Sequence, residues 1–202
     1  MLRNFLKVIL NSINADKVDL GSLVDITTGK LNANAAVENG KYPFFTCSRE
    51  IYAIDNYAFD LEAILLAGNN ASGDFNVKHF KGQFNAYQRT YIITVKKENK
   101  ILYRYLYFQL LKSLQEFKEM SVGANTRFLK LGMIQDLKIP LPTLQDQKAI
   151  VRQLDALREK TQKLETAYQK KIADLEELKK SILQRAFAGE LTEKNPEGII
   201  LL

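Results

Sequence analysis

Cysteine, histidine and long apolar runs are scarce in this chain of 202 residues. Cys47 is its single cysteine and His79 its single histidine, which excludes an intramolecular disulfide and a Cys/His zinc site. No run of 18 apolar residues is present, so we expect no membrane-spanning helix and no membrane partner. Lys7 interrupts the apolar start, and no small-residue cleavage site follows it. We expect a short amphipathic helix over residues 1–10 and a cytoplasmic protein.

Recognisable catalytic motifs are also missing. Gly68 and Gly73 have the outer spacing of a phosphate-binding loop, but Asp74 and Phe75 stand where that motif requires Lys and Ser or Thr. No G-x-G-x-x-G follows a strand-like segment, and no Ser or Cys nucleophile motif accompanies His79. We therefore predict that the chain is not an enzyme and binds no cofactor or metal of its own.

The longest regular pattern in the chain predicts one helix over residues 143 to about 187. Neither glycine nor proline interrupts this segment. Pro142 disfavours helix before it, and Thr143 with Asp146 three residues later resembles a capping box. Gly189 can end the last turn with a positive φ. At 1.5 Å per residue such a helix is roughly 65 Å long.

Apolar residues recur along this helix at alternating steps of three and four. They form a heptad seam, interrupted by Thr161, Lys171 and Arg185, that is typical of coiled coils. The expected dimerisation residues are Ile150, Leu154, Leu157, Leu164, Tyr168, Leu175, Leu178 and Ile182. A seam this long needs a partner helix; the alternative is a surface helix folded back on its own domain.

Charge and aromatic content divide the chain at Pro142. The net charge is +6, with 18 Lys and Arg against 13 Asp and Glu up to Pro142 and 11 against 10 after it. Of the 20 Phe and Tyr residues, 18 precede residue 143. We predict a basic globular domain over 1–142, a spacer and dimerisation helix over 143–191, and a tail over 192–202. A mild basic excess favours an anionic partner such as nucleic acid.

The globular part reads as several strands with few helices between them. Residues 63–67 predict a buried strand, residues 91–95 another, and residues 101–120 a helix. Residues 42–52 suggest an edge strand because Pro43 lies near their start. This order predicts an α+β fold with a mostly antiparallel or mixed sheet.

Polar side chains gather at the expected turns of this domain, including one at Lys81 and Gly82. Arg commonly pairs with guanine and Asn or Gln with adenine in the major groove, while Lys suits phosphates. The alternative is that loops are simply polar. The candidate DNA-binding residues are Asn69, Asn70, Lys78, Lys81, Gln83, Tyr87, Gln88, Arg89, Asn125 and Arg127.

Several segments resemble the specificity subunits of type I restriction–modification systems. Residues 20–29 (LGSLVDITTG), 64–68 (ILLAG) and 80–84 (FKGQF) are similar to a target recognition domain of that family. Residues 122–127 (VGANTR), 139–151 (IPLPTLQDQKAIV) and 186–191 (AFAGEL) resemble the end of that domain and the two ends of its spacer helix.

The resemblance implies a protein that binds DNA without catalysing a reaction. Usual members carry two recognition domains and two spacer helices, whereas this sequence shows one of each and looks like a half-subunit. The family's spacer helices pair antiparallel, so a homodimer of this chain is expected to read two inverted half-sites of double-stranded DNA. DNA methyltransferase subunits, which bring S-adenosylmethionine, are the implied partners, and restriction subunits are a further class.

Two other hypotheses remain open from the sequence. The chain could be a coiled-coil adaptor whose domain binds a ligand other than nucleic acid, which predicts no salt-dependent DNA retention. It could also be the detached recognition part of a single-chain methylase or nuclease. That hypothesis predicts activity with S-adenosylmethionine alone, and the missing motifs argue against it.

Overall fold

The computed structural model describes residues 2–96 and 100–189. The predicted tail over 192–202, including the apolar residues 199–202, lies outside the described residues. The chain divides into two compact units, residues 1–155 and 156–202. This division falls inside the long helix α5 (Leu144–Phe187), so the first unit contains the beginning of that helix.

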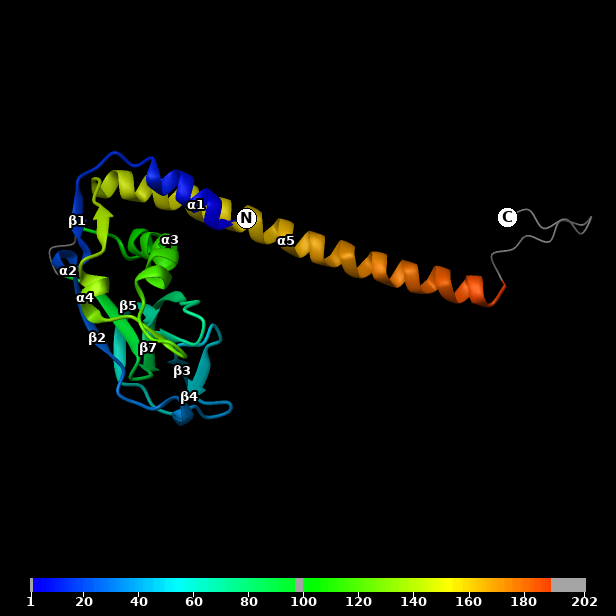
Figure 1. Cartoon of the computed structure of the whole chain (residues 1–202), viewed down its shortest axis with the longest axis horizontal. Coiled ribbons are helices and arrows are strands. Elements are labelled where there is room, and N and C mark those ends of the chain that lie inside the picture. Colours follow the sequence, from blue (N-terminus) through cyan, green and yellow to red (C-terminus); the bar gives the residue numbers. More distant parts are fainter. Residues whose placement is uncertain (1, 97–99, 190–202) are drawn as a thin grey trace, which may run out of the picture. The chain divides into compact units, whose positions relative to one another are not determined.

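The first unit contains most of the regular structure (Figure 1). Its further helices are α1 (Leu2–Asn11), α2 (Leu20–Leu23), α3 (Tyr103–Met120) and α4 (Leu131–Gln135), with a 3-10 turn at Ala33–Ala35. Its strands are β1 (Lys17–Asp19), β2 (Val24–Thr28), β3 (Tyr42–Phe45), β4 (Tyr52–Ile54), β5 (Phe59–Ala67), β6 (Asn69–Asn70), β7 (Val77–Ala86), β8 (Thr90–Val95), β9 (Arg127–Phe128) and β10 (Lys138–Pro140).

Six strands form the main sheet, in the order β2-β8-β5-β7-β3-β4. All neighbours are antiparallel except β3 and β7, which confirms the predicted α+β fold with a mixed sheet. The prediction that residues 42–52 form an edge strand is wrong, because β3 lies between β7 and β4. Pro43 is tolerated there because β3 pairs with β7 only at Phe44 and Phe45.

The two faces of the sheet hold separate apolar clusters, as alternation along a strand requires. Ile64 and Leu66 of β5 face a core that includes buried residues of α3, which lies against β5 and β7 (Figure 1). Ala63 and Leu65 face a second, smaller cluster with Phe84. A bridge between Leu31 and Tyr87 joins the chain after β2 to the chain after β7, which ties the segment after β2 to the β7–β8 turn.

Strand β7 continues through the position where a turn is predicted. Gly82 pairs with Leu61 in the middle of the β5–β7 ladder, so the predicted turn at Lys81 and Gly82 is wrong. Gly82 has a φ of +132°, a conformation that glycine adopts without strain. Phe80 and Phe84 stay on the same face of the strand on either side of it, so β7 continues through the glycine.

The start of α5 is anchored to the globular unit as well as capped. The hydroxyl of Thr143 accepts a hydrogen bond from the backbone N–H of Asp146 at 3.2 Å. Gln147 is fully buried; it donates to the carbonyls of Lys100 and Pro142, both at 2.9 Å, and accepts from the N–H of Leu102 at 2.9 Å. At its other end, α5 ends before Gly189, which has a φ of +75° as predicted.

Candidate nucleic-acid interface

Four loops of the globular unit converge at one end of the sheet, and we call them the loop cluster: residues 46–51, 68–76, 87–90 and 121–127. Asn76 donates to the carbonyl of Cys47 at 2.8 Å, and the Cys47 thiol donates to the carbonyl of Arg89 at 3.3 Å. The N–H of Gly68 also donates to the Arg89 carbonyl, at 2.9 Å. These bonds fix the 46–51, 68–76 and 87–90 loops against one another.

Gln88 and Arg89 occupy the tip of the turn that connects β7 to β8. The turn is closed by a hydrogen bond of 2.8 Å from the N–H of Thr90 to the carbonyl of Tyr87, and both tip side chains are exposed. A side chain at position 68 would place its Cβ 2.4 Å from the carbonyl oxygen of Arg89. Glycine at position 68 therefore permits the close approach that holds this turn in place.

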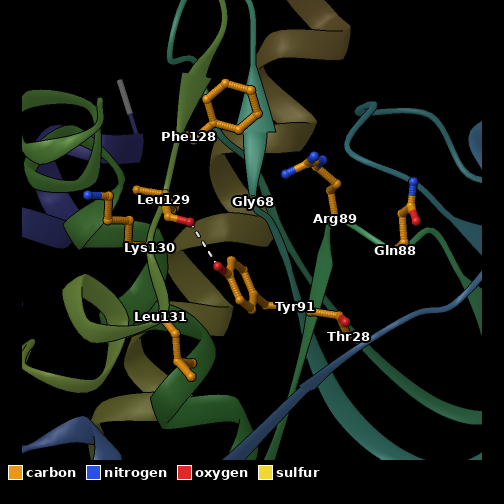
Figure 2. Close-up of a pocket in the computed structure, with 9 residues that line it drawn as sticks. All are labelled: Thr28, Gly68, Gln88, Arg89, Tyr91, Phe128, Leu129, Lys130 and Leu131. Carbon is orange, nitrogen blue, oxygen red and sulfur yellow. Dashed lines mark hydrogen bonds between the residues drawn. The ribbon is translucent and has the colours of Figure 1, made fainter. Parts of the chain in front are cut away.

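A cleft of about 390 Å³ opens beside this turn. Figure 2 labels the residues that line it: Thr28, Gly68, Gln88, Arg89, Tyr91, Phe128, Leu129, Lys130 and Leu131. The Arg89 guanidinium lies over the Phe128 ring, 5.3 Å from its centroid. The Tyr91 hydroxyl donates to the carbonyl of Leu129 at 2.8 Å, and Lys130 points away from Arg89 (Figure 2). The cleft thus combines a stacked arginine, an exposed lysine and an amide.

Positive charge predominates over the loop cluster and its border among the described residues, and the cleft itself is lined by Arg89 and Lys130 and by no carboxylate. The loop cluster and its border carry Arg49, Lys78, Arg89, Arg127 and Lys130, against the carboxylates of Glu50 and Asp74. One of these carboxylates, Asp74, is paired with Arg49. A concave surface with excess positive charge attracts polyanions.

Asn69, Asn70 and Arg127 lie in the loop cluster. The side chains of Asn70 and Arg127 are engaged in hydrogen bonds within the protein. Strand β6 pairs Asn69 with Phe128 and Asn70 with Arg127. The Asn70 side-chain oxygen accepts from the backbone N–H groups of Ser72 and Asp74, at 2.9 and 3.1 Å. The Arg127 guanidinium donates to the carbonyl of Lys118 at 3.2 Å and to the Ser121 hydroxyl at 2.9 Å, and so closes the end of α3.

Lys78 also belongs to the framework of the loop cluster. Its ammonium donates to the carbonyl of Ser48 and to the side-chain oxygen of Asn76, both at 2.6 Å. Burial lowers the pKa of Lys78 from 10.5 to about 8, because a low-dielectric environment disfavours the charged form. Lys78 therefore stabilises the 46–51 loop through its hydrogen bond to the carbonyl of Ser48.

Lys81 and Gln83 lie outside the loop cluster, on a part of β7 that faces carboxylates of β5. The Lys81 ammonium lies 3.4 Å from Glu62, which also contacts the imidazole of His79 at 2.9 Å. Gln83 donates to Asp60 at 3.1 Å. Tyr87 begins the β7–β8 turn, and exposed Asn125 lies in the 121–127 loop. The ten candidates therefore do not form one surface.

Most residues that line the cleft are missing from the sequence-based candidates, and two of them, Phe128 and Lys130, matter for its chemistry. Phe128 and Lys130 follow Arg127 directly, but an isolated Phe-Leu-Lys segment predicts only an apolar element with a solvated lysine. The pairing of β9 with β6 brings Phe128 against the Arg89 guanidinium and places Lys130 on the border of the same cleft. A signal was available in the neighbouring Arg127 and Lys130, which place two cations and one aromatic within four residues.

The expected dimerisation residues differ sharply in exposure. Leu154 is fully buried in the core of the globular unit, and Ile150 packs against the same core. Leu154 is therefore unavailable to a second chain. Leu157 is partly buried. Five others are 46–63% exposed: Leu164, Tyr168, Leu175, Leu178 and Ile182.

Solved structures define the class of fold. The chain superposes with a TM-score of 0.73 on a chain from a structure described as the basis of complex assembly and conformational transition in the type I R-M system, at 21% identity over 94% of this chain and 51% of that one. The S subunit of a type I restriction–modification system from M. genitalium gives a TM-score of 0.64, at 20% identity, over 77% of this chain and 42% of that one. The fold is that of specificity subunits.

Sequence comparisons identify the family itself. Residues 13–174 match the model of the type I restriction modification DNA specificity domain. The chain is 37% identical over 180 residues, 88% of its length, to the EcoDI type I restriction enzyme specificity subunit of Escherichia coli. It is 24% identical over 164 residues, 77% of its length, to a putative type I restriction enzyme specificity subunit of Haemophilus influenzae. The chain belongs to the family of type I restriction–modification specificity subunits.

The chain covers 38% and 40% of the lengths of these two relatives. Across residues 2–96 and 100–189, no helix is long and apolar enough to span a bilayer. In the same part of the chain, His, Cys, Asp and Glu side chains form no group of three or more that could hold a metal ion.

Proposed function

We propose that the globular unit binds double-stranded DNA in a sequence-specific manner, with the loop cluster entering the major groove of one half-site. The observation that carries this proposal is the cleft in which exposed Arg89, stacked on Phe128, lies with Gln88 and Lys130. The match to a DNA specificity domain supports the same function.

The chemistry of the cleft assigns different roles to its polar side chains. Arg89 can donate two parallel hydrogen bonds to the acceptors of guanine, the commonest specific contact in the major groove. Stacking on Phe128 holds the guanidinium, so less side-chain freedom is lost on binding. Lys130 is a flexible point charge and suits a phosphate. Gln88, held by a 3.0 Å hydrogen bond to Asn32, suits an adenine next to that guanine.

Selection from a random duplex pool tests this proposal. The purified chain is expected to enrich one sequence motif and to bind it about 10³-fold or more above random duplex, with an affinity that falls as salt rises. Absence of enrichment together with absence of salt-dependent retention would reject DNA recognition and favour the adaptor hypothesis.

We also propose that the exposed residues of α5 pair with a second copy of the chain, so that a homodimer reads a bipartite target and recruits DNA methyltransferase subunits. The support is the series of exposed apolar side chains between Leu164 and Ile182, because such a surface is stabilised by a partner helix. Light scattering is expected to give twice the 23.1 kDa chain mass. A mass that stays monomeric at high concentration would contradict this part.

A further inference from the structure

A groove of about 310 Å³ lies between α1 and the first turns of α5, within the globular unit (Figure 1). We call it the α1–α5 groove. The apolar residues that line it are Ile9, Ile13, Pro142, Ala149 and Ile150, and the exposed side chain of Gln153 lines it as well. The groove is distinct from the cleft beside Arg89 and shares no lining residue with it.

The apolar surface of the groove continues along α1. Val8 is 70% exposed and Phe5 is 45% exposed. Phe5 lies three residues before Val8 and four before Ile9, so these three side chains share one side of the helix. Exposed apolar side chains that adjoin a groove are typical of a binding surface. The whole surface therefore has room for more apolar side chains than the groove alone.

The sequence of residues 199–202, which we call the apolar tail, matches this surface. These residues are Ile-Ile-Leu-Leu, and four consecutive apolar residues in water are unfavourable unless they serve a function. Pro196 and Gly198 precede them and favour an extended segment over a continued helix. A helix is about 10–12 Å across, whereas a groove of about 310 Å³ suits a few side chains of an extended segment.

We propose that the apolar tail of a second copy occupies the α1–α5 groove. This inference rests on the proposed homodimer and adds a further contact to it. The tail of the same chain is too short to reach. From Gln153 to Phe187 the chain is one uninterrupted helix, which spans roughly 51 Å at 1.5 Å per residue. The segment from Phe187 to Ile199 covers at most about 43 Å when fully extended.

A second copy brings its tail within reach of the groove. The family resemblance implies spacer helices that pair antiparallel, so the end of one α5 comes close to the start of the other. The second copy's apolar tail then needs only a short extended path to the groove. There the exposed amide of Gln153 can bond to its backbone, as polar groups do in other complexes with extended peptides. Two-fold symmetry makes this contact occur twice in the dimer.

Cysteine cross-linking tests this contact in the whole chain with Cys47→Ser. Oxidation of the Gly198→Cys/Gln153→Cys variant is expected to give a covalent dimer, because position 198 directly precedes the apolar tail and position 153 lines the groove. Gly198→Cys/Lys148→Cys is the matched control. Lys148 is exposed on the same helix but does not line the groove, so this variant is expected to stay uncross-linked.

Light scattering of the unmodified chain separates the two possible failures. A strictly monomeric chain would overturn the homodimer and the tail contact together. If the chain is a dimer, three results overturn the tail contact alone: no cross-link in either variant, equal cross-linking of the two variants, or a disulfide formed within one chain.

Substitutions in the tail give a second readout that needs no cysteine. Ile200→Asp/Leu201→Asp places carboxylates against apolar side chains and is expected to raise the dimer dissociation constant roughly tenfold or more. Thr192→Asp/Asn195→Asp adds the same charge outside the apolar tail and is expected to leave the constant nearly unchanged. Ala149→Arg fills the groove and should weaken the dimer alone, but add little to Ile200→Asp/Leu201→Asp. If Ile200→Asp/Leu201→Asp dimerises as tightly as the parent chain, the proposal is wrong.

Discussion

Strand β7 presents lysines in two different surroundings only three residues apart. Lys78 lies beneath the loop cluster, where two oxygens accept its hydrogen bonds and burial lowers its pKa. Lys81 is exposed and faces Glu62, with Asp60 next to it on β5 opposite Gln83. The loop cluster keeps an excess of positive charge, whereas the Lys81 surface is neutralised by the facing strand. A basic residue near a glycine can therefore be assigned to a DNA contact only when the carboxylates that face it in the fold are known.

The largest expected effect concerns Lys78 and the pH dependence of stability. The pKa of Lys78 is about 8 in the folded chain, below its ordinary 10.5, so between these values the unfolded chain binds more protons. The unfolding free energy should therefore rise with pH between about 8 and 10.5, by up to about 2 kcal/mol once solvent screening of this partly exposed group is allowed for. Lys78→Met should show a smaller rise than the parent chain in urea unfolding at pH 7.5, 8.5 and 9.5; part of the rise remains because burial also lowers the pKa of Lys112.

Lys81→Met is the matched control for that measurement. Its pH profile should overlay that of the parent chain, because Lys78 and its two hydrogen bonds remain in place. If Lys78→Met retains the full rise of the parent chain, burial of Lys78 does not perturb its ionisation.

Arg89→Ala should have the largest effect on DNA binding. Loss of a bidentate contact to guanine should cost about 1–3 kcal/mol on the selected sequence and much less on random duplex. Fluorescence titration with both duplexes measures this difference. Equal losses on the two duplexes would make Arg89 a phosphate contact, and no loss on either would remove it from the interface.

Lys130→Ala should weaken binding to both duplexes by a similar factor, several-fold at moderate salt. Its proposed contact is a phosphate, so the slope of log affinity against log salt should fall by roughly one unit. Titrations at four salt concentrations give this slope. A selective loss on the enriched sequence would instead assign Lys130 to a base.

Lys81→Ala should have the smallest effect, below about 0.5 kcal/mol in DNA affinity, which is usual for surface substitutions away from a site. The same titrations measure it. An effect equal to that of Arg89→Ala would show that DNA covers the β5–β7 surface, and the distinction between the two regions would fail.

Local sequence patterns predicted the architecture well wherever interactions between residues close in the sequence determine it. The α5 helix follows from the absence of glycine and proline, and its ends from Thr143 and Gly189. The turn predicted at Gly82 was wrong. A glycine between polar residues usually marks a turn, but here the pairing of β7 with β5 keeps the strand extended. That pairing depends on residues about 20 positions away, which a local pattern cannot include.

The candidate site was predictable only in part, because contacts between segments far apart in the sequence decide which polar side chains reach the cleft and which are bonded within the protein. Arg89 is exposed at a turn tip, as its position suggests, but Arg127 is engaged with the end of α3. Lys130 enters the cleft through the β6–β9 pairing. Gln147, within the motif that resembles the family, is a fully buried structural anchor, which explains why an amide occupies that position.

Site-specific photocross-linking tests the central claim that DNA contacts the loop cluster. The photoreactive amino acid p-benzoylphenylalanine would replace Gln88 at the β7–β8 turn or, as the matched control, Gln83 on the Lys81 surface. Irradiation with labelled target duplex should give a protein–DNA adduct at position 88 and none at position 83. An adduct at position 83 without one at position 88 would contradict the account.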